Sequence, residues 1–243
     1  MRETFAELLM AQAGELGVQF EEGQIEQFYQ YFTLLTEWNK VMNLTAITEM
    51  EDVVTKHFVD SLSLVRIFPQ IAQESCSVID VGTGAGFPGI PLKIAFPSIK
   101  ITLLDSLNKR IRFLQEVTDK LKLQDVQAMH GRAEDYGRMK EYREQFDCCV
   151  SRAVANLSTL SEYCVPFVKV HGCFIPYKSG KVEEELKQAG NALKILGCHV
   201  ERTEEFLLPA TDASRVLVMI RKEKVLSRKY PRKAGMPSKE PLK

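Results

Sequence analysis

The sequence lacks the features of membrane, secreted and metal-binding proteins. No apolar run approaches the roughly 20 residues of a membrane span, and Glu3, Glu7 and Glu15 interrupt the region where a signal peptide would be apolar. The six cysteines and four histidines show no C-x-x-C, H-x-x-x-H or H-E-x-x-H spacing. We therefore expect a soluble, cytoplasmic protein with reduced cysteines, without a metal site and without a membrane partner.

An excess of charge of one sign is also missing, because 32 Lys and Arg balance 32 Asp and Glu. The balance hides a segregation: residues Arg221 to Lys243 contain nine basic and two acidic residues. A basic block of this kind is either a solvated tail or a contact surface for nucleic acid. The segment 227–243 has three prolines and no apolar periodicity, so it should be irregular unless another surface orders it.

The pattern of apolar residues changes at about residue 73. Before it, apolar residues recur at steps of three or four, which predicts a helix ending near Gly17, a second over 22–42 and a third over about 53–65. After it, strand-length apolar runs alternate with helical segments. The predicted strands are 77–81, 100–105, 126–131, 146–152, 172–177, 198–208 and 214–221, and the predicted helices are 88–95, 108–123, 157–168 and 182–196.

This alternation predicts an α/β fold with a doubly wound, Rossmann-like and mostly parallel sheet of seven strands. The last two strands follow each other without a helix between them, so they should pair antiparallel. We expect three parts: a helical extension over 1–72 packed on the core, an α/β domain over 73–222, and a basic, proline-containing tail over 223–243.

A glycine-rich loop follows the first predicted strand, in the stretch SVIDVGTGAGFPGIPLKI. In a doubly wound sheet, this is the usual place for a ligand. A P-loop is excluded, because Gly84 and Gly89 have its spacing but are not followed by Lys and Ser or Thr. Gly84, Gly86 and Gly89 also match G-x-G-x-x-G, but in the wrong frame relative to the strand, which leaves an NAD-dependent oxidoreductase as a weaker alternative.

The pattern that fits best is an acid with glycines two, four and six residues later: Asp80, Gly82, Gly84 and Gly86. It is similar to the first motif of class I S-adenosylmethionine-dependent methyltransferases, in which the glycine backbone passes close under the cofactor. In that fold an acid at the end of the second strand binds the ribose, and Asp105 stands at this position. S-adenosylmethionine has no phosphate, so prolines are tolerated where the next helix begins.

Residues after the third and fourth strands narrow the chemistry. Ala133 and Glu134 occupy the place that usually contacts the adenine. Arg152 should lie at the pocket mouth, where it would contact the cofactor carboxylate or RNA, or would only pair with an acid. The segment FDCCVSRAVANL contains neither the [ND]-P-P-[YF] turn used on exocyclic amines nor the Pro-Cys pair used on pyrimidine C5. A ring nitrogen with a free lone pair, such as guanine N7, is the acceptor that fits, and its methylation needs no general base.

Segments along nearly the whole chain resemble the bacterial small-subunit (16S) ribosomal RNA guanine-N7 methyltransferases, a family also called glucose-inhibited division protein B. The matching segments are WNKVMNLTAI, KHFVDSL, the glycine loop, LLDSLNKRIRFL, GRAED, SRAVA and KYPRKAGMPSKEPL. Ser151 is one departure, standing where alanine is common. The resemblance implies S-adenosylmethionine as cofactor and 7-methylguanosine in rRNA as product. The cofactor contacts that it implies are Gly82, Phe87, Asp105, Ala133, Glu134 and Arg152.

RNA is the partner that both the residues and the resemblance favour. Guanine N7 lies in the deep groove of A-form RNA, so the target should be unpaired or looped out. We expect a monomer that acts on small-subunit rRNA in a ribosomal subunit or an assembly intermediate. A non-catalytic assembly factor that keeps the cofactor fold is the alternative from another class. Candidate phosphate contacts are Lys40, Lys56, Arg66, Lys109, Arg110, Arg228, Lys229, Arg232 and Lys233.

Overall fold

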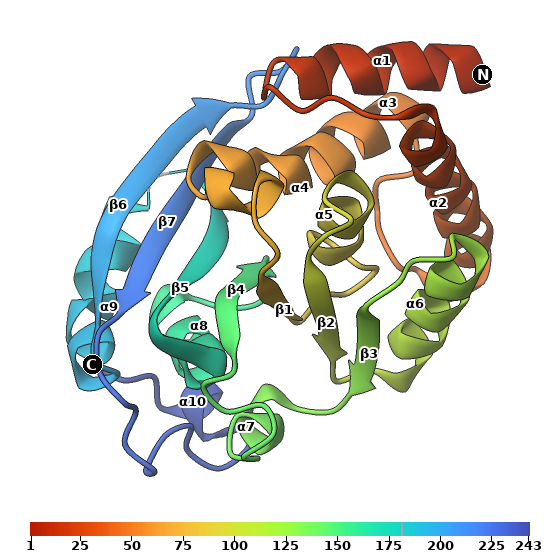
Figure 1. Ribbon diagram of the computed structural model, residues 1–243. Helices are drawn as coiled ribbons and strands as arrows, with labels where there is room; N and C mark the ends of the chain where they lie inside the picture. Colours follow the sequence, from red (N-terminus) through yellow and green to blue (C-terminus); the bar gives the residue numbers. More distant parts are fainter. Residues whose placement is uncertain (181) are drawn as a thin grey trace.

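A seven-stranded sheet in the order β3-β2-β1-β4-β5-β7-β6 forms the centre of the computed structural model, which describes residues 1–180 and 182–243 (Figure 1). The strands are β1 (Ser77–Val81), β2 (Lys100–Asp105), β3 (Val126–His130), β4 (Phe146–Arg152), β5 (Val168–Ser179), β6 (Cys198–Leu207) and β7 (Ser214–Lys222). β1 to β5 are parallel, and β7 pairs antiparallel with both β5 and β6. The predicted doubly wound sheet with an antiparallel final pair is confirmed.

Helices cover both faces of the sheet. Those that follow β1 are α5 (Gly89–Ala95), α6 (Asn108–Lys120), α7 (Ala133–Tyr136), α8 (Leu157–Cys164), α9 (Glu183–Ile195) and α10 (Met236–Lys239). The four longer ones lie within the predicted helices. The helix predicted over 157–168 is too long, because α8 is followed by the 3-10 segment η4 (Val165–Phe167) and β5 begins at Val168. The short α7 and α10 have too few residues to show a helical period. Within the described ranges, no helix is long and apolar enough to cross a membrane.

Successive residues of the central strands point to opposite faces and build two separate cores. Cys148 and Val150 of β4 belong to the core under α5 and α6, while Cys149 between them belongs to the core under α8 and α9. The central strands β1, β2 and β4 are buried on both faces, which explains why they read as continuous apolar runs rather than as alternating ones.

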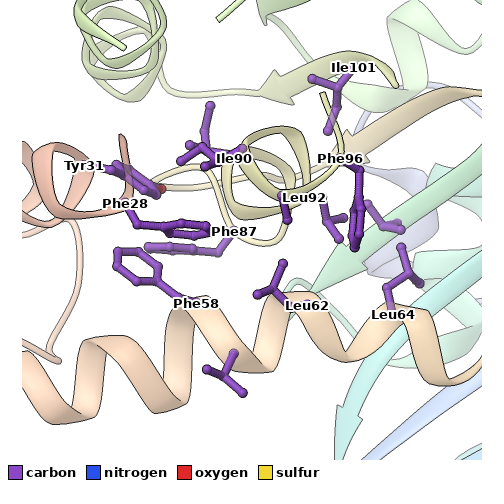
Figure 2. Packing of buried hydrophobic residues seen from close by; sticks show 14 of the residues in the cluster. Phe28, Tyr31, Phe58, Leu62, Leu64, Phe87, Ile90, Leu92, Phe96 and Ile101 are labelled. Atoms are coloured by element: carbon purple, nitrogen blue, oxygen red, sulfur yellow. The ribbon is translucent and has the colours of Figure 1, made fainter. Parts of the chain in front are cut away.

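The N-terminal helices share the first of these cores. They are α1 (Arg2–Gly14), α2 (Glu22–Met42), α3 (Met50–Val53), a π-helical turn η1 (Val54–Val59), α4 (Asp60–Leu62) and the 3-10 segments η2 (Ser63–Arg66) and η3 (Pro69–Ala72). Figure 2 shows Phe28, Tyr31 and Phe58 of this layer packed around Phe87 of the glycine loop. The helical layer therefore packs directly on the loop. The domain boundaries at residues 72 and 222 stay predictions.

The third predicted helix is helical throughout but changes type inside. The π turn is followed by hydroxyl groups that bond back to the helix: Ser61 Oγ donates to the His57 carbonyl and Ser63 Oγ to that of Asp60 (2.6 Å). Hydroxyls that compete for helix carbonyls loosen the regular ladder. Single π turns are often found at functional sites, and this one carries Lys56 and His57.

The basic C-terminal tail is ordered by the rest of the protein. Arg143 donates to three carbonyl oxygens within residues 226–230, and Arg138 donates to the carbonyl of Pro231 (2.6 Å). Glu144 accepts from the backbone N–H of Leu226 (3.0 Å). These partners come from the loop before β4, so the tail has the ordering surface that its own composition could not supply.

Tyr31 connects α2 to the glycine loop. Its buried hydroxyl donates to the Ala85 carbonyl (2.5 Å). A Cβ at Gly86 would lie 2.7 Å from Ile90, 2.8 Å from the Tyr31 hydroxyl and 2.9 Å from Leu114. The loop can approach α2 this closely only because residue 86 has no side chain.

We expect Tyr31→Phe to destabilise the protein by about 1–3 kcal/mol, because it leaves the buried Ala85 carbonyl without a donor. Urea unfolding measures this loss. Tyr29→Phe on the same helix is the control, since Tyr29 is half-buried and its hydroxyl makes no hydrogen bond to any described residue. Equal losses in the two variants would contradict the importance of the hydrogen bond.

Candidate functional site

Two cavities lie side by side at the carboxyl ends of the parallel strands. The first, the helix-side cavity, has a volume of about 630 Å³ and faces the π turn; the second, the tail-side cavity, has about 620 Å³ and faces α7 and the tail. They share Gly82, Arg110 and Ala153. Both open between β1 and β4, where the strand order reverses, which is the usual ligand position in an open α/β sheet.

The residues predicted to bind a cofactor are divided between these cavities. Gly82 lines both. Asp105, Ala133 and Glu134 line the tail-side cavity, whereas Phe87 and Arg152 line the helix-side cavity. The structure thus brings all of them to one edge of the sheet, although they are far apart in the sequence. Their roles as cofactor contacts stay predictions.

Asp80 holds the glycine loop from below. One of its oxygens accepts from the Thr83 hydroxyl (2.7 Å) near the start of the loop and from the Gly89 N–H (2.9 Å) at its end. Its other oxygen has no hydrogen-bond partner among the described residues. Burial raises the pKa of this carboxyl to about 7, against the two hydrogen bonds, which lower it. Asp80 therefore shapes the loop although it lines neither cavity.

Gly82 lies where the two cavities meet. Its backbone is left-handed (φ +72°), and a Cβ here would lie 2.5 Å from Cγ2 of Val154. The left-handed backbone favours glycine, and any side chain at this position would meet that of Val154. Because Gly82 has no side chain at the junction of the two cavities, a ligand can run through both.

Asp105 ends β2 and is almost fully buried. Its carboxylate accepts from the N–H groups of Gly84 and Leu107 (both 2.9 Å) and pairs with Arg110 (3.1 Å). A carboxylate offers about four lone-pair positions, and Arg110 reaches the fourth only weakly, at 3.5 Å from Oδ1, so a hydroxyl in the cavity can take that position. Asp105 can thus position the loop and bind a sugar hydroxyl at the same time.

Glu134 and Ala133 begin the short helix α7 beside the same cavity. Glu134 is 5% exposed, and its Oε1 accepts from the Gly235 N–H of the tail (2.8 Å). The predicted adenine contact is therefore also a support for the C-terminal segment.

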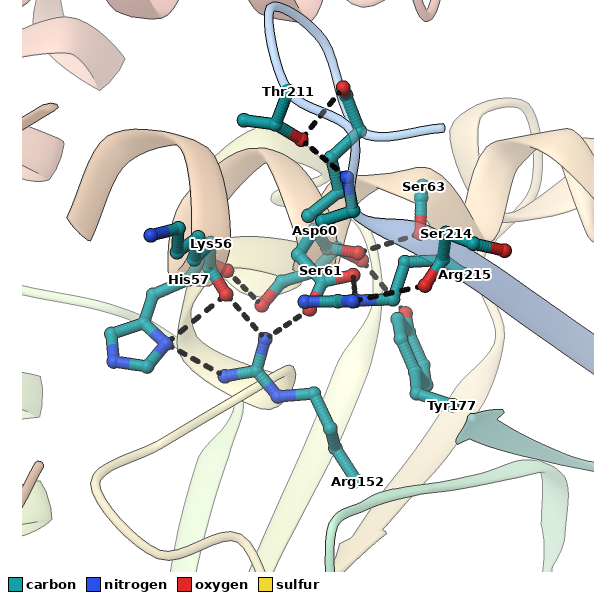
Figure 3. Close-up of polar contacts among 12 residues, drawn as sticks. Lys56, His57, Asp60, Ser61, Ser63, Arg152, Tyr177, Thr211, Ser214 and Arg215 are labelled. Carbon is teal, nitrogen blue, oxygen red and sulfur yellow. Dashed lines mark hydrogen bonds and ion pairs between the residues drawn. The ribbon is translucent and has the colours of Figure 1, made fainter. Parts of the chain in front are cut away.

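A buried carboxylate shared by two arginines lines the helix-side cavity, and Figure 3 shows the two arginine side chains beside it. Asp60, 2% exposed, lies 2.9 Å from Nη1 of Arg152 and 3.2 Å from Nε of Arg215. Arg152 also donates to the Lys56 carbonyl (3.2 Å), and its guanidinium lies 5.1 Å from the centre of the Phe87 ring. Arg152 thus pairs with an acid, which is one of its predicted interpretations, and it also lines the cavity.

His57 stacks on Phe87, with ring centres 4.4 Å apart and planes at 19°. Its Nε2 lies 2.8 Å from the Thr45 hydroxyl. Burial, and then the positive charge of Arg152, lower the pKa of this imidazole to about 3. The ring is neutral at physiological pH, so it contributes no charge to the cavity.

Several lining residues carried no usable signal in the sequence. His57 and Asp60 lie in the segment KHFVDSL, which marked the family resemblance without marking a site. Tyr177, on β5, donates its buried hydroxyl to the Ser61 carbonyl (2.7 Å), and Arg215 is the second residue of the antiparallel strand β7. Spacing alone cannot show that these side chains meet α4, just after the π turn.

The candidate phosphate contacts fall into two groups. Arg232 binds the buried Glu162 (2.7 Å), and Arg66 lies 4.9 Å over the Phe206 ring. Lys56 pairs with Asp52, and Arg110 with Asp105. Arg232 and Arg110 are therefore the least suited to RNA, because buried carboxylates already neutralise their charges. The remaining candidates are exposed and make no ion pair within the described part of the chain: Lys40, Lys109, Arg228, Lys229 and Lys233.

The strand order, the glycine loop and the acid at the end of β2 define the fold as that of a class I S-adenosylmethionine-dependent methyltransferase. Solved structures support the fold. The chain is similar to M. jannaschii TYW2 in complex with AdoMet, with a TM-score of 0.52 at 16% identity over 67% of this chain and 76% of that one. It is also similar to a SAM-dependent O-methyltransferase from Thermotoga maritima, with a TM-score of 0.51 at 14% identity over 68% and 65%.

Sequence comparison identifies the family within this class. A family model described as rRNA small subunit methyltransferase G matches residues 24–213. Two relatives named Ribosomal RNA small subunit methyltransferase G are similar over nearly their whole length. That of Lachnoclostridium phytofermentans is 54% identical over 93% of both chains, and that of Alkaliphilus metalliredigens is 52% identical over 94% of this chain and 95% of its own. The chain belongs to the rRNA small subunit methyltransferase G family, which confirms the resemblance.

The lowered pKa of His57 predicts a pH dependence of stability. As the pH falls below the unfolded value of 6.5, the imidazole takes up a proton in the unfolded chain but stays neutral in the folded protein until about pH 3. Between about pH 7 and about pH 5.5, the free energy of unfolding of the wild type, measured in urea, should therefore fall by about 1 kcal/mol more than that of His57→Gln. Thr45→Val, which keeps the imidazole, should retain the wild-type slope. Parallel curves for wild type and His57→Gln would exclude a buried neutral ring.

Proposed function

We propose that this protein transfers a methyl group from S-adenosylmethionine to N7 of a guanine in small-subunit rRNA. We also propose that it works in the cytoplasm, as a monomer, on a ribosomal subunit or an assembly intermediate. The observation that carries the proposal is the pair of cavities joined at Gly82, in a chain of this family. One cavity suits the cofactor's nucleoside, and the other suits its amino-acid end together with the methyl acceptor.

The residues present fit this cofactor. We assign Asp105, with Ala133 and Glu134, to the adenosine part, because buried acids beside a cavity suit ribose hydroxyls and an adenine amine. We assign Gly82 to the close approach of the backbone. When bound, S-adenosylmethionine supplies a methyl group on a positively charged sulfur, which is reactive without a metal.

Phe87 and Arg152 belong to the second half of the proposed site. Phe87 is 7% exposed and packed between rings, so its contact with a ligand falls to its backbone or ring edge. Arg152 and Arg215 share the single carboxylate of Asp60, which leaves one positive charge in excess. A carboxylate or phosphate in the cavity can neutralise that charge, since buried guanidinium groups require partners.

The helix-side cavity suits an acceptor that needs no deprotonation. Among the described residues lining it, both acids are ion-paired, Asp60 with arginines and Glu185 with Lys178 (2.6 Å). His57 is neutral, but Nε2 is engaged by Thr45. Guanine N7 carries a free lone pair, so the protein's task is to align it and to exclude water. This supports N7 over an exocyclic amine. The weaker oxidoreductase alternative has no support in the family comparison.

Gly82→Ala should weaken binding of S-adenosylhomocysteine by about tenfold or more, which corresponds to about 1.4 kcal/mol. The added Cβ enters the junction of the cavities, and the alanine must adopt a strained left-handed backbone. Isothermal titration calorimetry measures the effect. Gly17→Ala is the control, because Gly17 has nearly the same φ (+73°) and open space around it, away from both cavities. Wild-type affinity in Gly82→Ala would refute the assignment of this residue.

The reaction itself is tested on RNA. Small-subunit particles that lack the modification should gain 7-methylguanosine when incubated with the protein and S-adenosylmethionine, as detected by mass spectrometry of the nucleosides. Boiled protein is the control. If the protein binds the cofactor but forms no modified guanine on particles or on free rRNA, the non-catalytic assembly factor becomes the better description.

A further inference from the structure

The C-terminal tail forms part of the tail-side cavity. Gly235, Ser238 and Lys239 line it together with Asp105 and Glu134. Figure 1 shows α10 next to α7 and α8, beyond the carboxyl ends of the strands. The tail thus crosses the sheet edge and closes one side of the space that the proposed function gives to adenosine.

An ion pair inside the protein anchors this segment. Glu162 of α8 has no exposed surface, and Arg232 approaches its two oxygens with Nε (2.9 and 3.1 Å) and with Nη2 (2.7 Å). The backbone N–H of Arg232 donates to the same carboxylate (2.8 Å). Paired donors of this kind fix orientation as well as charge. Removing the arginine would leave a buried carboxylate without its cation.

Further hydrogen bonds place the tail against the cavity residues themselves. Glu134 accepts from the Gly235 N–H (2.8 Å), and the Thr159 hydroxyl donates to the Pro237 carbonyl (3.1 Å). Ser238 of the tail and Tyr163 of α8 line the same cavity. The position of Glu134 therefore depends on the tail, although the two are 101 residues apart in sequence.

The tail's basic residues are consequently of two kinds. Arg232 faces inward and is neutralised by Glu162. Arg228 and Lys229 are exposed, and their side chains make no ion pair with any described residue. Only the second kind has the free charge that a phosphate contact requires. The anchoring residue and the exposed ones can be tested separately, because they differ in what they touch.

We propose that the segment Tyr230–Lys239 is a wall of the cofactor site, held by the Arg232–Glu162 pair, and that Arg232 is a positioning residue for cofactor binding. The proposal rests on the proposed function, since it assigns the tail-side cavity to adenosine. It changes the role of the tail: its inner side serves the cofactor, while RNA contacts are confined to its outer side.

The first test is Arg232→Met, which removes the charge and keeps an apolar side chain of similar length. It should weaken S-adenosylhomocysteine binding by about tenfold in calorimetry. In rRNA methylation, the Michaelis constant for S-adenosylmethionine should rise, while the rate at saturating cofactor should change little. A purely structural role would instead lower the amount of active enzyme and leave the affinity of the folded fraction unchanged.

The matched control is the double variant Arg228→Gln, Lys229→Gln on the outer side of the same tail. It should bind S-adenosylhomocysteine like wild type. Its rRNA binding should depend less steeply on salt, with a slope smaller by about 0.9 or less for each phosphate that the variant no longer neutralises. Weaker cofactor binding in this control would contradict the division of the tail into two sides.

Ser238→Trp covers the case in which Arg232→Met does not fold. It leaves the anchoring ion pair intact and places a large ring at the cavity, so it should weaken S-adenosylhomocysteine binding without lowering the melting temperature. Wild-type affinity in Ser238→Trp, or in folded Arg232→Met, overturns the proposal for the tail alone. If wild type itself does not bind S-adenosylhomocysteine, the proposed function fails, and the role of the tail fails with it.

Discussion

The hydrogen bonds of the buried Asp80 carboxylate are the interaction on which the rest of the site depends. They join Thr83 near the start of the glycine loop to Gly89 at the beginning of α5, so the loop is held at both ends by one side chain. Tyr31 and Asp105 then hold it from two sides, at Ala85 and at Gly84. A loop constrained in this way presents Gly82 at the junction of the cavities without having to be ordered by a ligand, which lowers the entropic cost of binding.

The net charge of the helix-side cavity depends on the numbers of acidic and basic side chains that line it. Asp60 is shared by Arg152 and Arg215, and His57 adds no charge because its imidazole is neutral. The cavity is therefore positive, which favours binding of an anionic group. Its acids are held in ion pairs. A site of this composition favours alignment of a nucleophile that already has its lone pair over removal of a proton.

The tail illustrates how basic residues near each other in sequence can have different physical roles. Arg232 is bound to a fully buried carboxylate, whereas Arg228 and Lys229 extend into solvent. Desolvation makes the difference: a buried pair resists exchange with an outside phosphate, while a solvated lysine or arginine releases counterions when it meets one. A count of charges in the tail does not distinguish these cases.

The sequence by itself determined the sheet, the glycine loop and the position of Asp105, because these follow from local spacing. Strand ends of a parallel sheet converge, so residues that end β1 to β4 had to meet. Only the tertiary structure decided which charges pair across the site: Asp60 with Arg152 and Arg215, 92 and 155 residues apart, and Arg232 with Glu162, 70 residues apart. Such pairs depend on which helix faces pack against the sheet and on a π turn that residue spacing does not predict. Burial, which makes the loss of either partner costly, is a property of the assembled layers rather than of any segment.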